Sequence, residues 1–496
     1  MFESAELGHQ IAKDVYKREV PALREALLDA QYDLAQAKKF PVILLIAGVD
    51  GSGKGETANL LNEWMDPRHI KTHAFAAPTP EEAARPPMWR FWQALPPKGE
   101  IGIFFGSWYT DPIVRRCYGQ IKKDALDHAL EEIVRFERML TDEGALVIKL
   151  WFHLSREKQK ARIKTMLKDP KTSWRVTEQD LYHLKLYEKF RNISGHVLSE
   201  TSTANAPWIV IEGYDANYRN LTSGKYILDA IKKALSLTEK KPRKATTPPL
   251  LKPLDKLQVL STLDLSKALT DNQYDKQLEK YQRKLNLLTR DAKFKNMSVV
   301  IAFEGADAAG KGGSIRRITQ AVDARFYNII PVAAPTEEER AQPYLWRFWR
   351  HIPAKDRLTI FDRSWYGRVL VERVEGFCSV QDWMRAYSEL NDFEEQLTQH
   401  DILLLKFWLQ ISPEEQLRRF EERQKISFKR YKITDEDWRN RKKWDAYQTA
   451  VCDMVDRTST ELCPWILVEA NDKNYARIKI MHELCERLEQ KLDKKN

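Results

Sequence analysis

The chain has 496 residues, of which 43% are hydrophobic and 31% are charged, a composition typical of globular proteins. No apolar run approaches the roughly 20 residues of a membrane-spanning helix, so a membrane protein is not expected. The N-terminus lacks the features of a secretory signal, and the 5 cysteines show no C-x-x-C spacing, which favours a reduced, cytoplasmic protein without a zinc site. The net charge of +10 fits either a solvated basic surface or a polyanionic partner.

The first half of the chain begins with helical character over residues 1–39. Residues 42–47 are predicted to form a buried strand that leads into the glycine-rich loop Gly48–Gly55. A helix is expected over residues 59–65 and a second strand over residues 71–76. A strand, a glycine-rich loop and a helix in this order are typical of a phosphate-binding α/β protein.

An aromatic helix with the sequence Trp-Arg-Phe-Trp is predicted within residues 86–95. We interpret its two tryptophans, which are three residues apart, as core residues. The next strand ends in Phe105 and Gly106, directly before a Ser-Trp-Tyr sequence that starts at Ser107.

A proline-rich segment separates two copies of the same pattern. Residues 240–253 contain prolines and no apolar periodicity, which is typical of an extended linker. The loop Gly48–Gly55 returns as Gly305–Gly312, and the same offset holds for most of each half. We therefore predict two tandem domains, residues 1–238 and 259–496, joined by a Pro/Lys-rich linker at 239–258.

The second loop follows a predicted buried strand, residues 298–303, and precedes an apolar helix that starts at Ile315. Backbone N–H groups of such a loop bind phosphate oxygens, and Lys311 would reach the transferred phosphate. A tight turn with Asp307 as a helix N-cap is the alternative. Gly312 stands where a Mg²⁺-binding Ser or Thr is usual, so we expect carboxylates, rather than a hydroxyl, to bind a metal or to handle an acceptor proton. The predicted phosphate-binding residues of the loop are Gly305, Gly310, Gly312, Gly313 and Ser314.

The third strand distinguishes the two halves. In the second half it ends in Asp362 and Arg363, before the repeated Ser-Trp-Tyr sequence, whereas the first half has Phe105 and Gly106 there. The fold does not need the Asp-Arg pair, so we interpret Asp362 and Arg363 as catalytic rather than as parts of a capped turn. The first half is expected to be impaired, although its loop lysine leaves residual anion binding open.

A basic segment follows a predicted helix, residues 381–399, and an apolar strand, residues 402–411. Residues 412–437 are rich in Arg and Lys, which fits a solvated helix pair or a mobile lid that supplies cations to phosphate. The last strand, residues 465–469, leads to Asp472 and Lys473, which either touch a nucleotide or cap the final helix. The predicted phosphate-binding residues of the lid are Arg419, Arg423 and Arg430.

Together, the loop, the Trp-Arg-Phe-Trp and Phe-Asp-Arg-Ser-Trp-Tyr sequences and the Ala-Asn-Asp-Lys sequence resemble the family-2 polyphosphate kinases. The two fused domains are similar to the polyphosphate:AMP phosphotransferase subgroup of that family. The resemblance implies two P-loop kinase-like domains, each a three-layer α/β/α parallel sheet with a helical lid.

The same resemblance implies transfer of a phosphoryl group from inorganic polyphosphate to AMP, giving ADP, with Mg²⁺. Its catalytic set falls on Asp307, Lys311, Asp362 and Arg363, and we expect the two carboxylates to bind the metal. Arg373, Asp472 and Lys473 are expected near the nucleotide. A homodimer is a further expectation, without a membrane or a specific nucleic acid as partner. An ATP-dependent nucleotide kinase of the same fold and a non-enzymatic polyanion-binding protein are the alternatives.

Overall fold

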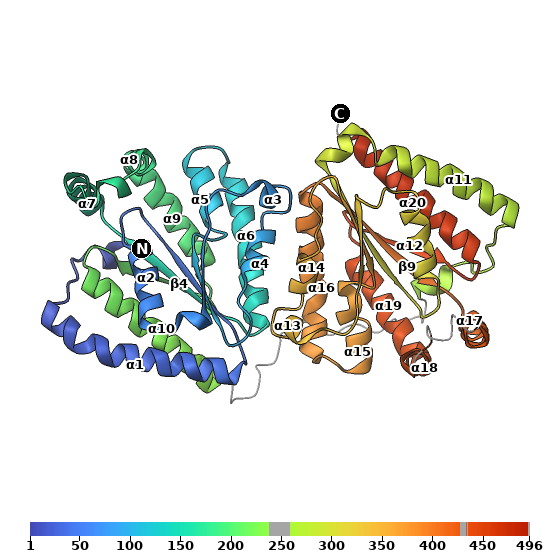
Figure 1. Ribbon diagram of the computed structural model, residues 1–496, viewed down its shortest axis with the longest axis horizontal. Helices are drawn as coiled ribbons and strands as arrows, with labels where there is room; N and C mark the ends of the chain where they lie inside the picture. The colour runs from blue at the N-terminus through green and yellow to red at the C-terminus, as the bar shows by residue number, and fades with distance from the viewer. Residues whose placement is uncertain (238–257, 427–432, 434, 495–496) are drawn as a thin grey trace. The chain divides into compact units, whose positions relative to one another are not determined.

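In the computed structural model the chain forms two α/β units, each built around one five-stranded sheet (Figure 1). The structure describes residues 1–237, 258–426, 433 and 435–494. Nearly all of the predicted linker, and with it the predicted domain boundaries, lies outside the described residues, so these boundaries stay a prediction. None of the helices in the described parts of the chain is long and apolar enough to cross a membrane.

The first sheet is parallel throughout, with the spatial order β2-β3-β1-β4-β5. Its strands are β1 (Val42–Gly48), β2 (Ile70–Ala74), β3 (Ile101–Phe105), β4 (Leu146–His153) and β5 (Trp208–Glu212). The α-helices of this half are α1 (Lys13–Ala37), α2 (Lys54–Trp64), α3 (Pro80–Ala83), α4 (Trp89–Ala94), α5 (Thr110–Cys117), α6 (Lys123–Asp142), α7 (Arg156–Lys168), α8 (Glu178–Lys185), α9 (Tyr187–Thr201) and α10 (Ala216–Leu237).

The second sheet is also parallel and repeats this order as β7-β8-β6-β9-β10. Its strands are β6 (Ser298–Gly305), β7 (Tyr327–Pro331), β8 (Leu358–Asp362), β9 (Ile402–Gln410) and β10 (Trp465–Glu469). The α-helices are α11 (Asp271–Leu288), α12 (Lys311–Thr319), α13 (Glu337–Arg340), α14 (Trp346–Trp349), α15 (Val371–Glu375), α16 (Val380–Gln399), α17 (Pro413–Lys425), α18 (Asp435–Lys442), α19 (Trp444–Thr458) and α20 (Lys473–Asp493).

Helices cover both faces of each sheet, as Figure 1 shows for each unit by itself. In the first unit α1, α2 and α10 lie on one face, and α6 and α9 lie on the other. In the second unit α11, α12 and α20 lie opposite α16 and α19. The predicted three-layer α/β/α architecture is therefore confirmed in both halves. Trp92, Trp346 and Trp349 are buried, which confirms the core interpretation for these three tryptophans, whereas Trp89 is only half-buried.

A buried lysine is held identically in the two units. In the second unit Lys406 Nζ donates to Glu394 Oε2 at 2.7 Å, to the Tyr366 hydroxyl at 2.9 Å and to the Thr458 carbonyl at 2.6 Å. Lys149 makes the corresponding three contacts in the first unit. A buried charge is tolerated only when it is paired and hydrogen-bonded, so this network ties β9, α16 and α19 together.

We expect Lys406→Met to lower the free energy of unfolding of the second unit by about 3–5 kcal/mol, because the buried carboxylate of Glu394 loses its partner. Denaturant unfolding followed by tryptophan fluorescence measures the change. Lys276→Met, at an exposed position of α11, is the control. An equal, small effect of both substitutions would contradict the expectation.

Candidate active site

The glycine-rich loop of the second unit joins the end of β6 to the start of α12. Gly305 has φ +150°, and a Cβ atom at this position would lie 2.7 Å from the Leu409 carbonyl oxygen, so only glycine fits. Lys311 Nζ donates to the Gly305 carbonyl at 2.8 Å. Burial lowers the pKa of Lys311, against the opposing charges of Asp307 and Asp362. The helix N-cap is Gly310 rather than Asp307, so the alternative of Asp307 as a cap does not hold.

The four predicted catalytic residues come together around this loop. Asp362 ends β8 and pairs in register with Phe303 of β6, which places it beside the start of the loop. The next residue, Arg363, donates from Nη2 to Asp307 Oδ1 at 3.2 Å. A lysine, a guanidinium and two carboxylates thus gather at the carboxyl edge of the parallel sheet, where ligands bind in open α/β folds.

The basic segment forms helices that reach this centre. Ser412 caps α17 by accepting the Glu415 N–H at 3.2 Å. From α18, Asn440 Nδ2 donates to Asp307 Oδ2 at 2.9 Å, and Glu436 lies 3.7 Å from Arg363. The sequence analysis missed Asn440. Its counterpart at the same offset is His183, and that difference is the signal that could have drawn attention to it.

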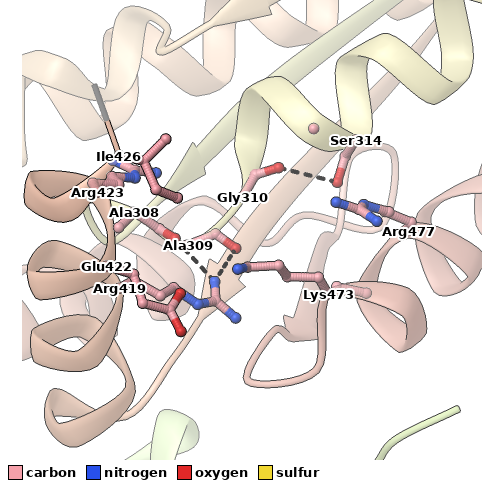
Figure 2. Close-up of a pocket in the computed structure, with 12 residues that line it drawn as sticks. Ala308, Ala309, Gly310, Ser314, Arg419, Glu422, Arg423, Ile426, Lys473 and Arg477 are labelled. Carbon is pink, nitrogen blue, oxygen red and sulfur yellow. Dashed lines mark hydrogen bonds between the residues drawn. The ribbon is translucent and has the colours of Figure 1, made fainter. Parts of the chain in front are cut away.

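A cavity of about 200 Å³ opens beside the loop, between α17 and α20 (Figure 2). Figure 2 shows Lys473 and Arg477 entering from α20 and Arg419 from α17. Ala308, Ala309 and Gly310 of the loop also line it, together with Gly313 and Ser314. The cavity is lined by four cationic side chains, Arg419, Arg423, Lys473 and Arg477, and by one carboxylate, Glu422, which pairs with Arg418. The chemistry of such a cavity suits an extended polyanion.

Arg419 has a different position from the other cations. It is 2% exposed, and its guanidinium donates to the carbonyls of Ala308, Ala309, Ala470 and Asn471 and to Glu415. These contacts use its donors to brace the loop against the end of β10. Its predicted contact with phosphate stays a prediction, and Arg430 lies outside the described residues.

The remaining predicted residues divide between the cavity and other places. Lys473 lines the cavity, where burial lowers its pKa. Asp472 instead caps α20 by accepting the Tyr475 N–H at 2.7 Å. Arg373 pairs with Asp453 at 2.7 Å and lies over the ring of Trp383, so the structure does not bring it to the cavity. Its role toward a nucleotide is untested.

In the first unit, the corresponding space holds an ion pair of the chain itself. Glu56 takes the place of Gly313, and Arg219 takes the place of Ala476. Arg219 is 1% exposed and donates to Glu56 Oε2 at 2.9 Å, and Arg162 also donates to Glu56. Burial raises the pKa of Glu56, but the two guanidinium charges outweigh this effect and lower it. A carboxylate thus occupies the place beside the loop that is open in the second unit.

Three of the four cations of the cavity have no cationic counterpart in the first unit. Met166, Ala216 and Asn220 stand where the second unit has Arg423, Lys473 and Arg477. The loop carboxylate Asp50 remains and contacts His183 Nδ1 at 2.6 Å. Burial raises its pKa, but Lys54 and His183 lower it to about 2.

Comparison with known proteins identifies the family of the chain. The fold and the loop define an α/β protein that binds phosphoryl groups at the carboxyl edge of a parallel sheet. The profile of polyphosphate kinase 2 matches residues 10–239 and 268–496, and the chain belongs to this family.

Three relatives cover nearly the whole chain. A polyphosphate:AMP phosphotransferase of Pseudomonas aeruginosa is 55% identical over 99% of both chains. The protein of the same name from Acinetobacter johnsonii is 36% identical over 93% of this chain and 94% of its own. A crystal structure from Pseudomonas aeruginosa assigned to polyphosphate kinase 2 superposes with a TM-score of 0.90 at 52% identity, covering 100% of both chains.

We expect Lys311→Ala to reduce phosphotransferase activity by at least about a hundredfold, because a preorganised charge contact is removed. Lys54→Ala is the matched variant in the first unit and should cost less than about threefold, since Phe105 and Gly106 replace the predicted catalytic pair there. Steady-state turnover of the two purified variants is the measurement. Equal losses would show that both loops work.

Proposed function

We propose that the second unit transfers a phosphoryl group from inorganic polyphosphate to AMP, giving ADP. The observation that carries this proposal is the cationic cavity lined by Ala308–Gly310, the loop residues that lie between Asp307 and Lys311 in the chain, with Arg363 bound to Asp307. The names of the relatives, polyphosphate:AMP phosphotransferases, support both the donor and the acceptor. The filled counterpart in the first unit supports a single reaction site per chain.

Phosphoryl transfer needs in-line placement and neutralisation of charge more than covalent help. The donor chain lies along the loop N–H groups and the cations of α17 and α20. AMP presents its phosphate from the side of Asp362. Lys311 and Arg363 offset the charge of the transferred group. A dedicated base is unnecessary, because a phosphate monoester with a second pKa of about 6 is already largely ionised near pH 7.

Mg²⁺ is the metal that fits this chemistry. It binds proteins through one or two carboxylates together with substrate phosphates, and Asp307 and Asp362 supply two carboxylates beside the loop. When bound, the ion would offset the negative charge of donor and acceptor phosphates. Within the described residues no group of three or more His, Cys, Asp or Glu side chains forms a metal site. A homodimer and a cytoplasmic location stay predictions of the sequence.

The direct test mixes the purified chain with AMP, polyphosphate and Mg²⁺ in the absence of ATP and follows ADP by chromatography. We expect ADP to form, and Asp362→Asn to reduce its rate by at least about a hundredfold because charge is lost at the strand end. Asp275→Asn, at an exposed position of α11, is the control. Near-normal turnover of Asp362→Asn would remove this residue from the site. ADP formed only with ATP in place of polyphosphate would indicate an ordinary nucleotide kinase.

Binding of long polyphosphate should weaken steeply with salt, by analogy with other polyanions whose binding releases counterions. Arg477→Ala should reduce the slope of log affinity against log salt by about one. Titration at several salt concentrations measures it, with Arg487→Ala as the control on the same helix outside the cavity. An unchanged slope for Arg477→Ala would argue that Arg477 does not contact the donor.

A further inference from the structure

One buried carboxylate beside the loop has no part in the chemistry described so far. Glu304 is the last residue of β6 before Gly305, and it is 5% exposed. Its Oε1 accepts the Ser364 N–H at 2.7 Å and the Ser364 hydroxyl at 2.8 Å. Burial of a carboxylate at the end of an apolar strand costs free energy unless the group is hydrogen-bonded, and the two bonds from Ser364 offset part of this cost.

Glu304 acts on the turn that carries Arg363. Arg363 has φ +66°, a left-handed backbone conformation that residues other than glycine rarely adopt. The Arg363 N–H donates to the Phe303 carbonyl at 3.0 Å, and the following N–H, that of Ser364, donates to Glu304. Two consecutive residues of β6 therefore hold two consecutive peptide groups of the turn. In this conformation the Arg363 guanidinium reaches Asp307.

The charge of Glu304 also belongs to this centre. Burial raises the pKa of Glu304, while its bonds to Ser364 and the charges of Lys311 and Arg363 oppose that rise. In turn, Glu304 is among the acidic groups that act on the pKa values of Lys311 and Arg363. The carboxylate is thus electrostatically coupled to both cations of the proposed reaction centre.

The first unit has the same turn without the contact between a buried carboxylate and the serine. Ala47 stands in place of Glu304, and Gly106, with φ +78°, stands in place of Arg363. The Ser107 N–H is accepted by the Thr110 hydroxyl at 3.1 Å instead of by a carboxylate. The half without the Asp-Arg pair therefore lacks the buried carboxylate and has a glycine where the left-handed conformation is unstrained.

We propose that Glu304 is a positioning residue: by binding the N–H and hydroxyl of Ser364, it holds Arg363 in the left-handed conformation that directs its guanidinium toward the transferred phosphoryl group. This inference rests on the proposed function, because the role of Arg363 in transfer is part of it. Glu304 itself touches no substrate.

The kinetic test compares Glu304→Ala, Glu304→Gln, Arg363→Ala and the double variant Glu304→Ala/Arg363→Ala in ADP formation from AMP and polyphosphate. We expect Glu304→Ala to lower kcat about tenfold to a hundredfold, since a small misplacement of a catalytic group has this effect. The KM for polyphosphate should change less than about twofold, because the cavity cations are untouched. Glu304→Gln keeps an oxygen that accepts the Ser364 N–H and should retain most of the activity.

The double variant isolates the route through Arg363. In the Arg363→Ala background, adding Glu304→Ala should cost less than about threefold, because residues that act as a unit are non-additive. Thr110→Ala removes the corresponding acceptor in the first unit and should leave activity unchanged. Wild-type kcat for Glu304→Ala, or fully multiplicative losses in the double variant, would overturn the proposal.

A structural readout separates this proposal from the proposed function. In a crystal structure of Glu304→Ala we expect Arg363 to leave the left-handed region and its guanidinium to leave Asp307, whereas Glu304→Gln should keep both. Arg363 unchanged in Glu304→Ala would overturn the positioning role even if the enzyme transfers phosphate as proposed. A wild-type chain that makes no ADP would instead overturn the proposed function, and the two structures would still decide whether Glu304 holds the turn. If Glu304→Ala does not fold, Ser364→Ala, which removes only the hydroxyl, should give a smaller loss in the same direction.

Discussion

The register between β6 and β8 is the constraint on which the site depends. Phe303 pairs with Asp362, so β8 ends beside the start of the loop and Arg363 follows at the turn. A slip of one residue would move every side chain of β8 to the other face of the sheet and take Asp362 away from the loop. The first unit has the same register, with Ile46 opposite Phe105. The strand register that places a carboxylate beside the loop is therefore the same in the first unit, and only the residue at the end of the strand differs.

Much of the fold could be predicted, because apolar runs and glycine-rich turns carry local signals. The strands around the loop were predicted to within a few residues, and repetition of one pattern allowed each half to serve as a control for the other. That comparison also singled out Asp362 and Arg363, since Phe105 and Gly106 replace them without loss of the following Ser-Trp-Tyr sequence. The structure then places both residues beside the loop, with Arg363 bound to Asp307.

The residues that the sequence did not reveal act through tertiary contacts. Asn440 contacts Asp307 from a helix 133 positions away, and Arg477 lines the cavity from the face of α20. Asp472 has the same local sequence whether it binds a nucleotide or caps a helix, and only the folded chain shows that it caps. Glu304 belongs to this group as well, because the sequence shows a carboxylate within an apolar strand but does not show that Ser364 binds it.

The two units have the same sheet topology but different arrangements of charge beside the loop. In the first, Glu56 pairs with Arg219 and Arg162 and offsets one of their two positive charges, and the turn at Gly106 carries no strain. In the second, several cations surround one cavity, and Arg363 adopts a conformation that costs about 1–2 kcal/mol. These two features of the second unit, the clustered cations and the strained turn, weaken the folded state in the absence of a polyanion, as is common where function requires strain or like charges. Since the Lys149 and Lys406 networks are the same in both units, this part of the core does not contribute to the difference, which lies at the loop and at the turn that carries Arg363.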